Sequence, residues 1–200
     1  MTESETKSID GAVPKRGMSM STLGMVLTLA SIACFFAALM VAYAFILPSG
    51  STATPVSMPW VFWLSTLLML SSSGTLQWAR WALLRAQLTS YRSWLSVTIV
   101  VGYGFLAAQT AGAWFLLANG VGVSANPQGN MYYVFCFIHG AHLVGGIGGL
   151  HWLRRKALLL VDGEEQPLRK HRQIARLTSM YWHFMGVLWL GLFAFLLGWS

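Results

Sequence analysis

Long stretches without a charged residue dominate this chain of 200 residues. The intervals 17–79, 93–153 and 177–200 contain no Asp, Glu, Lys or Arg. A helix that crosses about 30 Å of hydrocarbon at 1.5 Å per residue needs about 20 apolar residues. The three intervals therefore predict five helices, at about 22–47, 60–78, 94–119, 131–153 and 177–199.

Turn-forming residues support these boundaries. Proline interrupts helical hydrogen bonding, and all six prolines fall outside the five ranges: Pro14, Pro48, Pro55, Pro59, Pro127 and Pro167. Residues 1–21 are expected to form a polar tail, and residues 22–200 the helical domain. The amphipathic stretch WARWALLRAQ at 78–87 predicts that the second helix continues past its apolar part toward Gln87.

Composition agrees with helices in a bilayer. Hydrophobic residues make up 56% of the chain and charged residues only 10%, which leaves too little polar surface for an ordinary soluble domain. We therefore expect an all-α fold, a polytopic membrane protein with five transmembrane helices.

The basic residues predict an orientation. All 13 Lys and Arg residues lie before the first helix, between the second and third, or between the fourth and fifth, which is one side of the membrane if all five helices cross it. The positive-inside rule makes this side cytoplasmic, so the N-terminus is inside and the C-terminus outside. The net charge of +7 then follows from topology and anionic headgroups, and it does not indicate nucleic-acid binding.

Tryptophans mark the expected membrane boundaries, where amphipathic rings are favoured. The group near the outer helix ends comprises Trp60, Trp63, Trp114 and Trp199. The group near the inner ends comprises Trp78, Trp81, Trp94, Trp152 and Trp182. Trp189 alone is expected to lie deep in the membrane.

No carboxylate is predicted at membrane depth. All six acidic residues lie in the N-terminal tail or between the fourth and fifth helices. Ion-coupled transport usually depends on buried acids, so we expect that the chain does not translocate ions by itself. A small five-helix transporter remains an alternative, which transport in liposomes would distinguish.

Three histidines within the helices raise the question of metal or haem binding. His139 and His142 lie three residues apart on one helix and share a face, so they cannot be opposite axial ligands of one haem. His183 on the fifth helix would lie about 9 Å from the inner boundary, against about 16 Å for His142. No thiolate or acid completes a metal site. We expect these histidines and Gln109 to hydrogen-bond within or between helices; a haem b membrane anchor remains an alternative.

Two sequence blocks carry a family resemblance: HGAH at 139–142 followed by Gly145-Gly146, and YWHF at 181–184 followed by VLW at 187–189. They resemble the HGxH helix and the closing YWHF helix of subunit III of haem-copper terminal oxidases (cytochrome c and quinol oxidases), in its short five-helix bacterial form. The second helix, with WLST at 63–66 and SSS at 71–73, and Gln109 in the third are also similar. The resemblance runs from about residue 22 to the C-terminus.

The resemblance implies a non-catalytic integral subunit of a respiratory oxidase that reduces O2 in aerobic electron transport. It would stabilise the catalytic subunit I, accompany subunit II, and bind phospholipids in a bacterial inner membrane with its C-terminus in the periplasm. Haem and copper would lie in the partner subunits and not in this chain. An accessory subunit of a nitric oxide reductase-type complex is an alternative. The residues expected to organise the fold and contact lipids, rather than catalyse, are His139, His142, Trp182, His183, Trp189 and Gln109.

Two positions depart from the family pattern. The family often carries a carboxylate in the first of these helices, after a serine like Ser31, where this chain has Ile32. Another carboxylate is common after the glutamine of the third helix, where this chain has Gly112. A role of such carboxylates in proton delivery therefore does not transfer to this chain.

Overall fold

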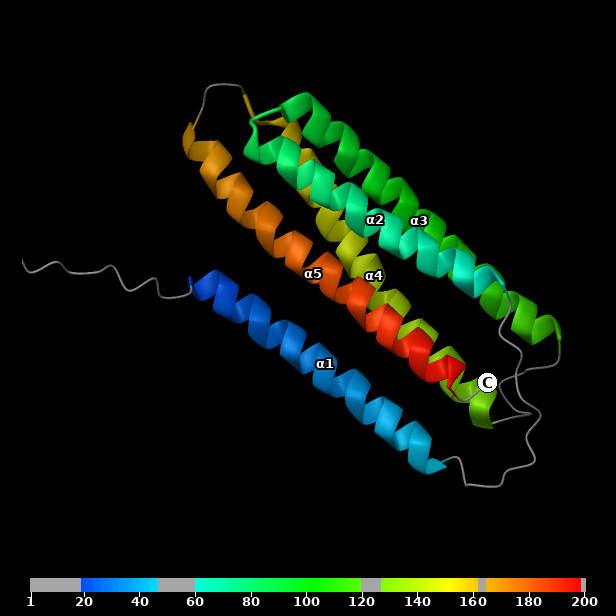
Figure 1. Ribbon diagram of the computed structural model, residues 1–200. Coiled ribbons are helices and arrows are strands. Elements are labelled where there is room, and N and C mark those ends of the chain that lie inside the picture. Colours follow the sequence, from blue (N-terminus) through cyan, green and yellow to red (C-terminus); the bar gives the residue numbers. More distant parts are fainter. Residues whose placement is uncertain (1–18, 47–59, 120–126, 162–164, 199–200) are drawn as a thin grey trace, which may run out of the picture.

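The computed structural model describes residues 19–46, 60–119, 127–161 and 165–198 (Figure 1). These residues form five helices, and no strand occurs among them: α1 (Met20–Ile46), α2 (Val61–Leu84), α3 (Leu88–Ala118), α4 (Pro127–Leu158) and α5 (Glu165–Leu197). The all-α fold class and the five helices are confirmed. The predicted polar tail lies outside the described residues except for 19–21, and α1 already begins within it at Met20.

The helices are longer than the apolar ranges that predicted them. α4 begins at Pro127 instead of near 131, and α5 begins at Glu165 instead of near 177. Pro127 and Pro167, which lie outside the apolar ranges, therefore lie in the first turns of two helices. This position tolerates proline because the first N–H groups of a helix have no acceptor within it.

A tight turn joins α2 to α3. α2 ends at Leu84 and does not reach Gln87, so only residues 85–87 separate the two helices. Ala86 adopts a φ of 56°, in the left-handed region that glycine favours after a helix C-terminus. The N–H of Gln87 donates to the carbonyl of Ala82 at 2.9 Å, which closes the helix end and folds α3 back along α2.

Four of the described helices are long and apolar enough to cross a membrane, over Met20–Phe45, Leu88–Ala118, Tyr132–Leu158 and Gln166–Leu197. The protein is therefore a multi-pass membrane protein. α2 is not among these four, and its central part contains several serines and threonines. Some of these hydroxyls bond to the helix itself: Ser65 and Thr66 both donate to the carbonyl of Phe62 at 2.8 Å.

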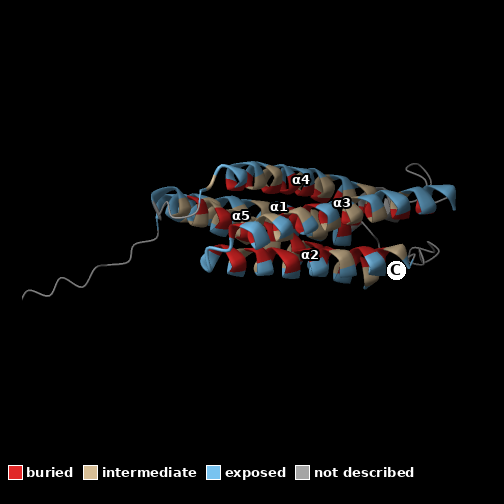
Figure 2. Ribbon diagram, turned by 90° about the horizontal axis from the view of Figure 1, so that it is seen from above, coloured by how far each residue is buried: buried red, intermediate tan, exposed pale blue. Residues whose placement is uncertain are grey.

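The helices α2, α3, α4 and α5 form a ring in which each packs against two neighbours, and α1 lies outside against α5 (Figure 1). Buried residues lie on the faces that the helices turn toward one another (Figure 2). Among the described side chains of α1, only Phe36 and Tyr43 are buried. The ring of Phe36 reaches α4, where it contacts His139 and His142 at centroid distances of 6.4 and 5.8 Å.

Candidate functional site

Trp182 and Trp189 of α5 fill the interior of the four-helix ring, where both are fully buried. The Nε1–H of Trp182 donates to Ser72 Oγ at 3.1 Å, and that of Trp189 to Thr66 Oγ1 at 3.0 Å. Both acceptors belong to α2, so the two indoles connect α5 to α2 across the ring. The height of Trp182 groups it with the tryptophans at the inner helix ends, but its side chain points into the bundle and does not face lipid.

Two glycines make room for the indole of Trp182. A Cβ at Gly102 on α3 would lie 3.0 Å from Cη2 of the indole, and one at Gly146 on α4 would lie 3.3 Å from its Cε3. Small residues therefore allow α3 and α4 to approach α5 closely. Gly145 and Gly148 differ, since an added Cβ there would meet no atom within 4 Å.

His139 is buried among aromatic rings. Its imidazole lies 6.4 Å from Phe36, 6.1 Å from Phe105 and 5.5 Å from Trp189, measured between ring centroids. Among the described residues, neither of its ring nitrogens has a hydrogen-bond partner. The hydrogen bond expected for His139 is therefore not found in this part of the chain, and the imidazole packs as an aromatic ring.

His142 lies on the side of α4 that faces α1, and it is partly buried. Its Nδ1–H donates to the carbonyl of Ile138 at 2.8 Å, and its own carbonyl accepts from the hydroxyl of Tyr181 at 2.8 Å. These contacts agree with the expectation that a polar group in a bilayer bonds within or between helices.

Gln109 connects three helices. Its Nε2 donates to Ser65 Oγ on α2 at 2.6 Å, and its Oε1 accepts from the thiol of Cys136 on α4 at 3.9 Å. The expected interhelical hydrogen bonding of this residue is confirmed.

A cavity of about 280 Å³ lies beside Gln109 and His139, between α3 and α4. Its other walls are mainly apolar and aromatic, and they include Phe137 and Thr110 at the surface. Phe137 is 78% exposed, so the cavity opens on the outside of the ring. Such a space suits an apolar chain or a small apolar molecule.

His183 of α5 lies apart from the other two helical histidines. It is partly buried, and it lies within electrostatic range of the positive charge of Arg80 on α2. His139 and His142 instead contact Phe36 of α1. Within the described ranges, no group of three or more His, Cys, Asp or Glu residues is placed to hold a metal ion.

Hydrogen bonds at the basic end of the bundle were missed from the sequence. Arg92 of α3 donates to a carbonyl in the last turn of α4 and to one two residues after that helix, both at 3.0 Å. Arg172 of α5 donates to two carbonyls at the end of α2, at 3.3 and 3.1 Å. The hydroxyl of Tyr91 and Nε2 of His171 are 2.9 Å apart. The last carbonyls of a helix lack internal partners and carry partial negative charge, which arginine satisfies. Arg92 and Arg172 lie near the N-termini of their own helices, so no local pattern in the sequence links them to the C-termini of α4 and α2.

At Gly112, the second position that departs from the family pattern, the ring of Phe62 fills the space that a side chain would need. A Cβ at Gly112 would lie 2.6 Å from Cζ of this ring, so no side chain fits at Gly112 while Phe62 stays in position. Ile32, the first position that departs from the family pattern, is partly buried and packs against the hydrophobic core. Both positions are therefore apolar in their surroundings as well as in sequence.

Comparison with known proteins agrees with the resemblance. The cytochrome c oxidase subunit 3 of Corynebacterium diphtheriae is 30% identical over 128 residues, which are 64% of this chain and 60% of that relative, or less than two thirds of its length. The same-named protein of Thermostichus vulcanus is 28% identical over 183 residues, 87% of this chain and 85% of the relative. The cytochrome bo(3) ubiquinol oxidase subunit 3 of Pseudomonas putida is 30% identical over 186 residues, 90% of this chain and 86% of the relative. A family model described as cytochrome c oxidase subunit III matches residues 2–200, and the chain therefore belongs to this family.

Proposed function

We propose that this chain is a non-catalytic membrane subunit, subunit III, of a haem-copper terminal oxidase that reduces O2, and that it stabilises the catalytic subunit I with subunit II as a further partner. The observation that carries the proposal is the family match over residues 2–200. Relatives named for both cytochrome c and ubiquinol oxidases support the same class of complex.

The contacts of the predicted residues support a structural role. The indoles of Trp182 and Trp189 bond to α2, and Gln109 joins α2 to α4. His142 bonds to a carbonyl of its own helix. These side chains hold helices together, which is what a subunit that supports another chain requires.

We assign the haems and copper to the partner subunits, because the histidines of this chain do not fit a haem. His139 and His142 lie three residues apart on α4 and both contact Phe36, so they approach from one side. Phe105 and Trp189 also pack around His139. His183 lies on another helix, α5, within electrostatic range of the cationic Arg80 of α2.

We further propose that phospholipids bind to the outside of the bundle. The cavity beside Gln109 and His139 supports this assignment, because it is largely apolar and opens on the outer surface of α3 and α4. An acyl chain is the ligand that a membrane supplies to such a space.

All five helices are proposed to cross a bacterial inner membrane, with the N-terminus in the cytoplasm and the C-terminus in the periplasm. α2 has 24 residues, or about 36 Å at the helical rise, which exceeds the hydrocarbon thickness. The one-sided distribution of the 13 basic residues supports the orientation, and the bacterial relatives support the membrane. A reporter that is active only in the periplasm, fused after Ser200, should be active.

Purification through an affinity tag in mild detergent tests the proposed function. Mass spectrometry of the co-eluting chains should identify an oxidase subunit I, and the haem absorbance should follow that partner. Co-elution with nitric oxide reductase chains would replace the proposal with the alternative. A Soret band of the separated chain that is lost in His142→Ala would contradict it.

A further inference from the structure

Polar side chains gather on the side of the bundle where α2 lies against α5. Gln77 and Arg80 lie three residues apart on α2 and share a face. His183 of α5 lies within electrostatic range of the positive charge of Arg80, and all three side chains are partly buried. An added Cβ at Gly186 would lie 3.4 Å from Oγ of Ser73, which places this part of α2 close beside this part of α5.

The donors of these side chains have few acceptors. The guanidinium group of Arg80 carries five N–H groups, and its one hydrogen bond to a described residue, to Oε1 of Gln77, is long at 3.5 Å. The imidazole of His183 has no hydrogen-bond partner among the described residues. Arg92 and Arg172, at the same end of the bundle, instead donate to two carbonyls each.

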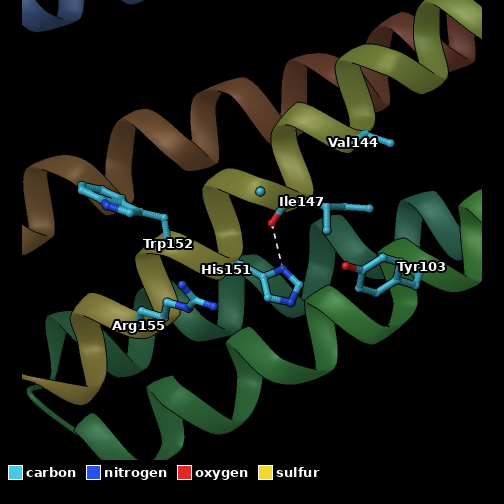
Figure 3. Close-up of a pocket in the computed structure, with 7 residues that line it drawn as sticks. Tyr103, Val144, Ile147, His151, Trp152 and Arg155 are labelled. Carbon is cyan, nitrogen blue, oxygen red and sulfur yellow. Dashed lines mark hydrogen bonds between the residues drawn. The ribbon is translucent and has the colours of Figure 1, made fainter.

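Two other histidines of the bundle show how an imidazole can be satisfied within its own helix. The Nδ1–H of His151 donates to the carbonyl of Ile147 at 3.1 Å (Figure 3). That of His142 donates to the carbonyl of Ile138 at 2.8 Å. His183 makes no such bond to a carbonyl of the described part of α5, so its ring nitrogens are available to a group from outside these helices.

No carboxylate of the helices can neutralise Arg80. The sequence has no Asp or Glu between residues 11 and 161 or after residue 165. Glu165 begins α5, 18 residues before His183, which is about 27 Å along the helix. Charged side chains at membrane depth usually pair with one another or with backbone carbonyls, so a cation without an acid in its own helices points to a partner.

Depth favours a carboxylate of another helix over a lipid phosphate. The charge-free part of α5 begins at residue 177, so His183 lies about 9 Å inside the inner boundary of the hydrocarbon, whereas lipid phosphates lie at the membrane surface. Val187 and Leu190 follow His183 by four and seven positions and share its face. They are 67% and 38% exposed, so the face continues as an apolar surface that α1 leaves uncovered.

We propose that this face of α2 and α5 binds a transmembrane helix of a partner subunit, and that an Asp or Glu of that helix pairs with Arg80 and accepts a hydrogen bond from His183. The amide of Gln77 donates to the same carboxylate, which can accept several hydrogen bonds. The apolar surface at Val187 packs against the rest of the helix. The inference rests on the proposed function, since it assigns one contact surface of the oxidase subunit and the chemistry of the group that it binds.

Photo-crosslinking in the tagged complex identifies what covers the face. A benzophenone amino acid at Val187, one turn from His183, should cross-link to a transmembrane helix of another oxidase subunit. That helix should carry an Asp or Glu within about two turns of the linked residue. A cross-linked helix without an acid at that depth would overturn the proposal.

Dissociation of the chain from the solubilised complex tests the charge pair. Arg80→Gln should dissociate about thirtyfold faster than the wild type, the effect of removing one side of a desolvated charge pair, and Arg80→Lys, which keeps the charge, should dissociate more slowly than Arg80→Gln. Replacing the partner's acid with its amide should add little in the Arg80→Gln background. Arg155→Gln removes an exposed arginine of α4 (Figure 3) and is the matched control. Equal rates for Arg80→Gln and Arg155→Gln would overturn the proposal.

Failure of the proposed function is distinguishable from failure of this inference. Absence of oxidase chains from the wild-type eluate would refute the proposed function. An intact oxidase complex in which the probe at Val187 cross-links only to phospholipid would refute the inference alone, because lipid would then cover the face.

Discussion

Replacing Gly112 with alanine is expected to destabilise the bundle, because Phe62 of α2 already occupies the space. An alanine Cβ would lie 2.6 Å from Cζ and 2.8 Å from Cε1 of the ring, whereas carbon atoms normally approach to about 3.5–4.0 Å. The ring cannot turn away freely, since it is 1% exposed and packs edge-on against Tyr132 at 5.4 Å. Either the ring or α3 must move.

The magnitude follows from two opposed effects. Overpacking of a tight core costs about 1–3 kcal/mol, whereas alanine in place of glycine inside a helix gains about 0.8–1.0 kcal/mol. Gly145→Ala is the matched control, because no atom lies within 4 Å of a Cβ there and only the gain applies. We therefore expect Gly112→Ala to be less stable than Gly145→Ala by about 1–3 kcal/mol.

Unfolding free energies in mixed micelles, measured for both variants and the wild type, provide the assay. Phe62→Leu supplies a second test, since a leucine lacks the ring atoms that an alanine at Gly112 would meet. In that background Gly112→Ala should raise stability instead of lowering it. Equal stabilities of Gly112→Ala and Gly145→Ala, or a double-mutant cycle without coupling between positions 62 and 112, would refute the reasoning.

Four further substitutions test other contacts. Trp182→Phe removes the hydrogen bond to Ser72 and leaves a space in the core, and the hydrogen-bond share of the cost should be about 1 kcal/mol in unfolding free energy; an equal total cost in a Ser72→Ala background would show that the bond does not contribute. Ala86→Gly should stabilise the protein by about 1 kcal/mol, because glycine adopts the left-handed turn without strain, and an unchanged Tm would contradict this. Arg92→Gln should speed amide exchange in the last turn of α4 but not in its middle; unchanged exchange at that end would argue against the cap. His139→Leu should raise Tm, since it removes two buried nitrogens without a described partner, and a lower Tm would reveal a partner for the imidazole.

The number of helices could be predicted from charge-free intervals, but their ends could not. The apolar pattern measures how much of a helix lies in hydrocarbon, whereas helical hydrogen bonds continue through polar residues. The first turn of α5 therefore contains Pro167, and α2 stops at Leu84 although its amphipathic pattern continues. What ends α2 is the left-handed backbone of Ala86, a conformation that alanine does not signal in a sequence.

The position of Trp182 could have been predicted from helical periodicity. It lies seven residues before Trp189, and residues seven apart share a helix face. Met185, Leu192 and Leu196 continue the same face, and all five side chains are buried. An estimate of depth along the helix axis placed Trp182 near a boundary, but the face to which a residue belongs decides whether it meets lipid or protein. The partners of these side chains depend on which helices are neighbours, and the apolar pattern leaves that open.

The serines and threonines of α2 fit its place in the ring. Ser65, Thr66 and Ser72 each donate to a carbonyl of their own helix, at 2.8, 2.8 and 2.7 Å. Each hydroxyl oxygen then also accepts a hydrogen bond from another helix, from the amide of Gln109 on α3 or from an indole of α5. All three hydroxyls are buried, so none needs water. A hydropathy scale counts these side chains as polar, yet they contribute almost no polar surface to the outside of the bundle, so they do not oppose the proposed crossing of the bilayer by α2.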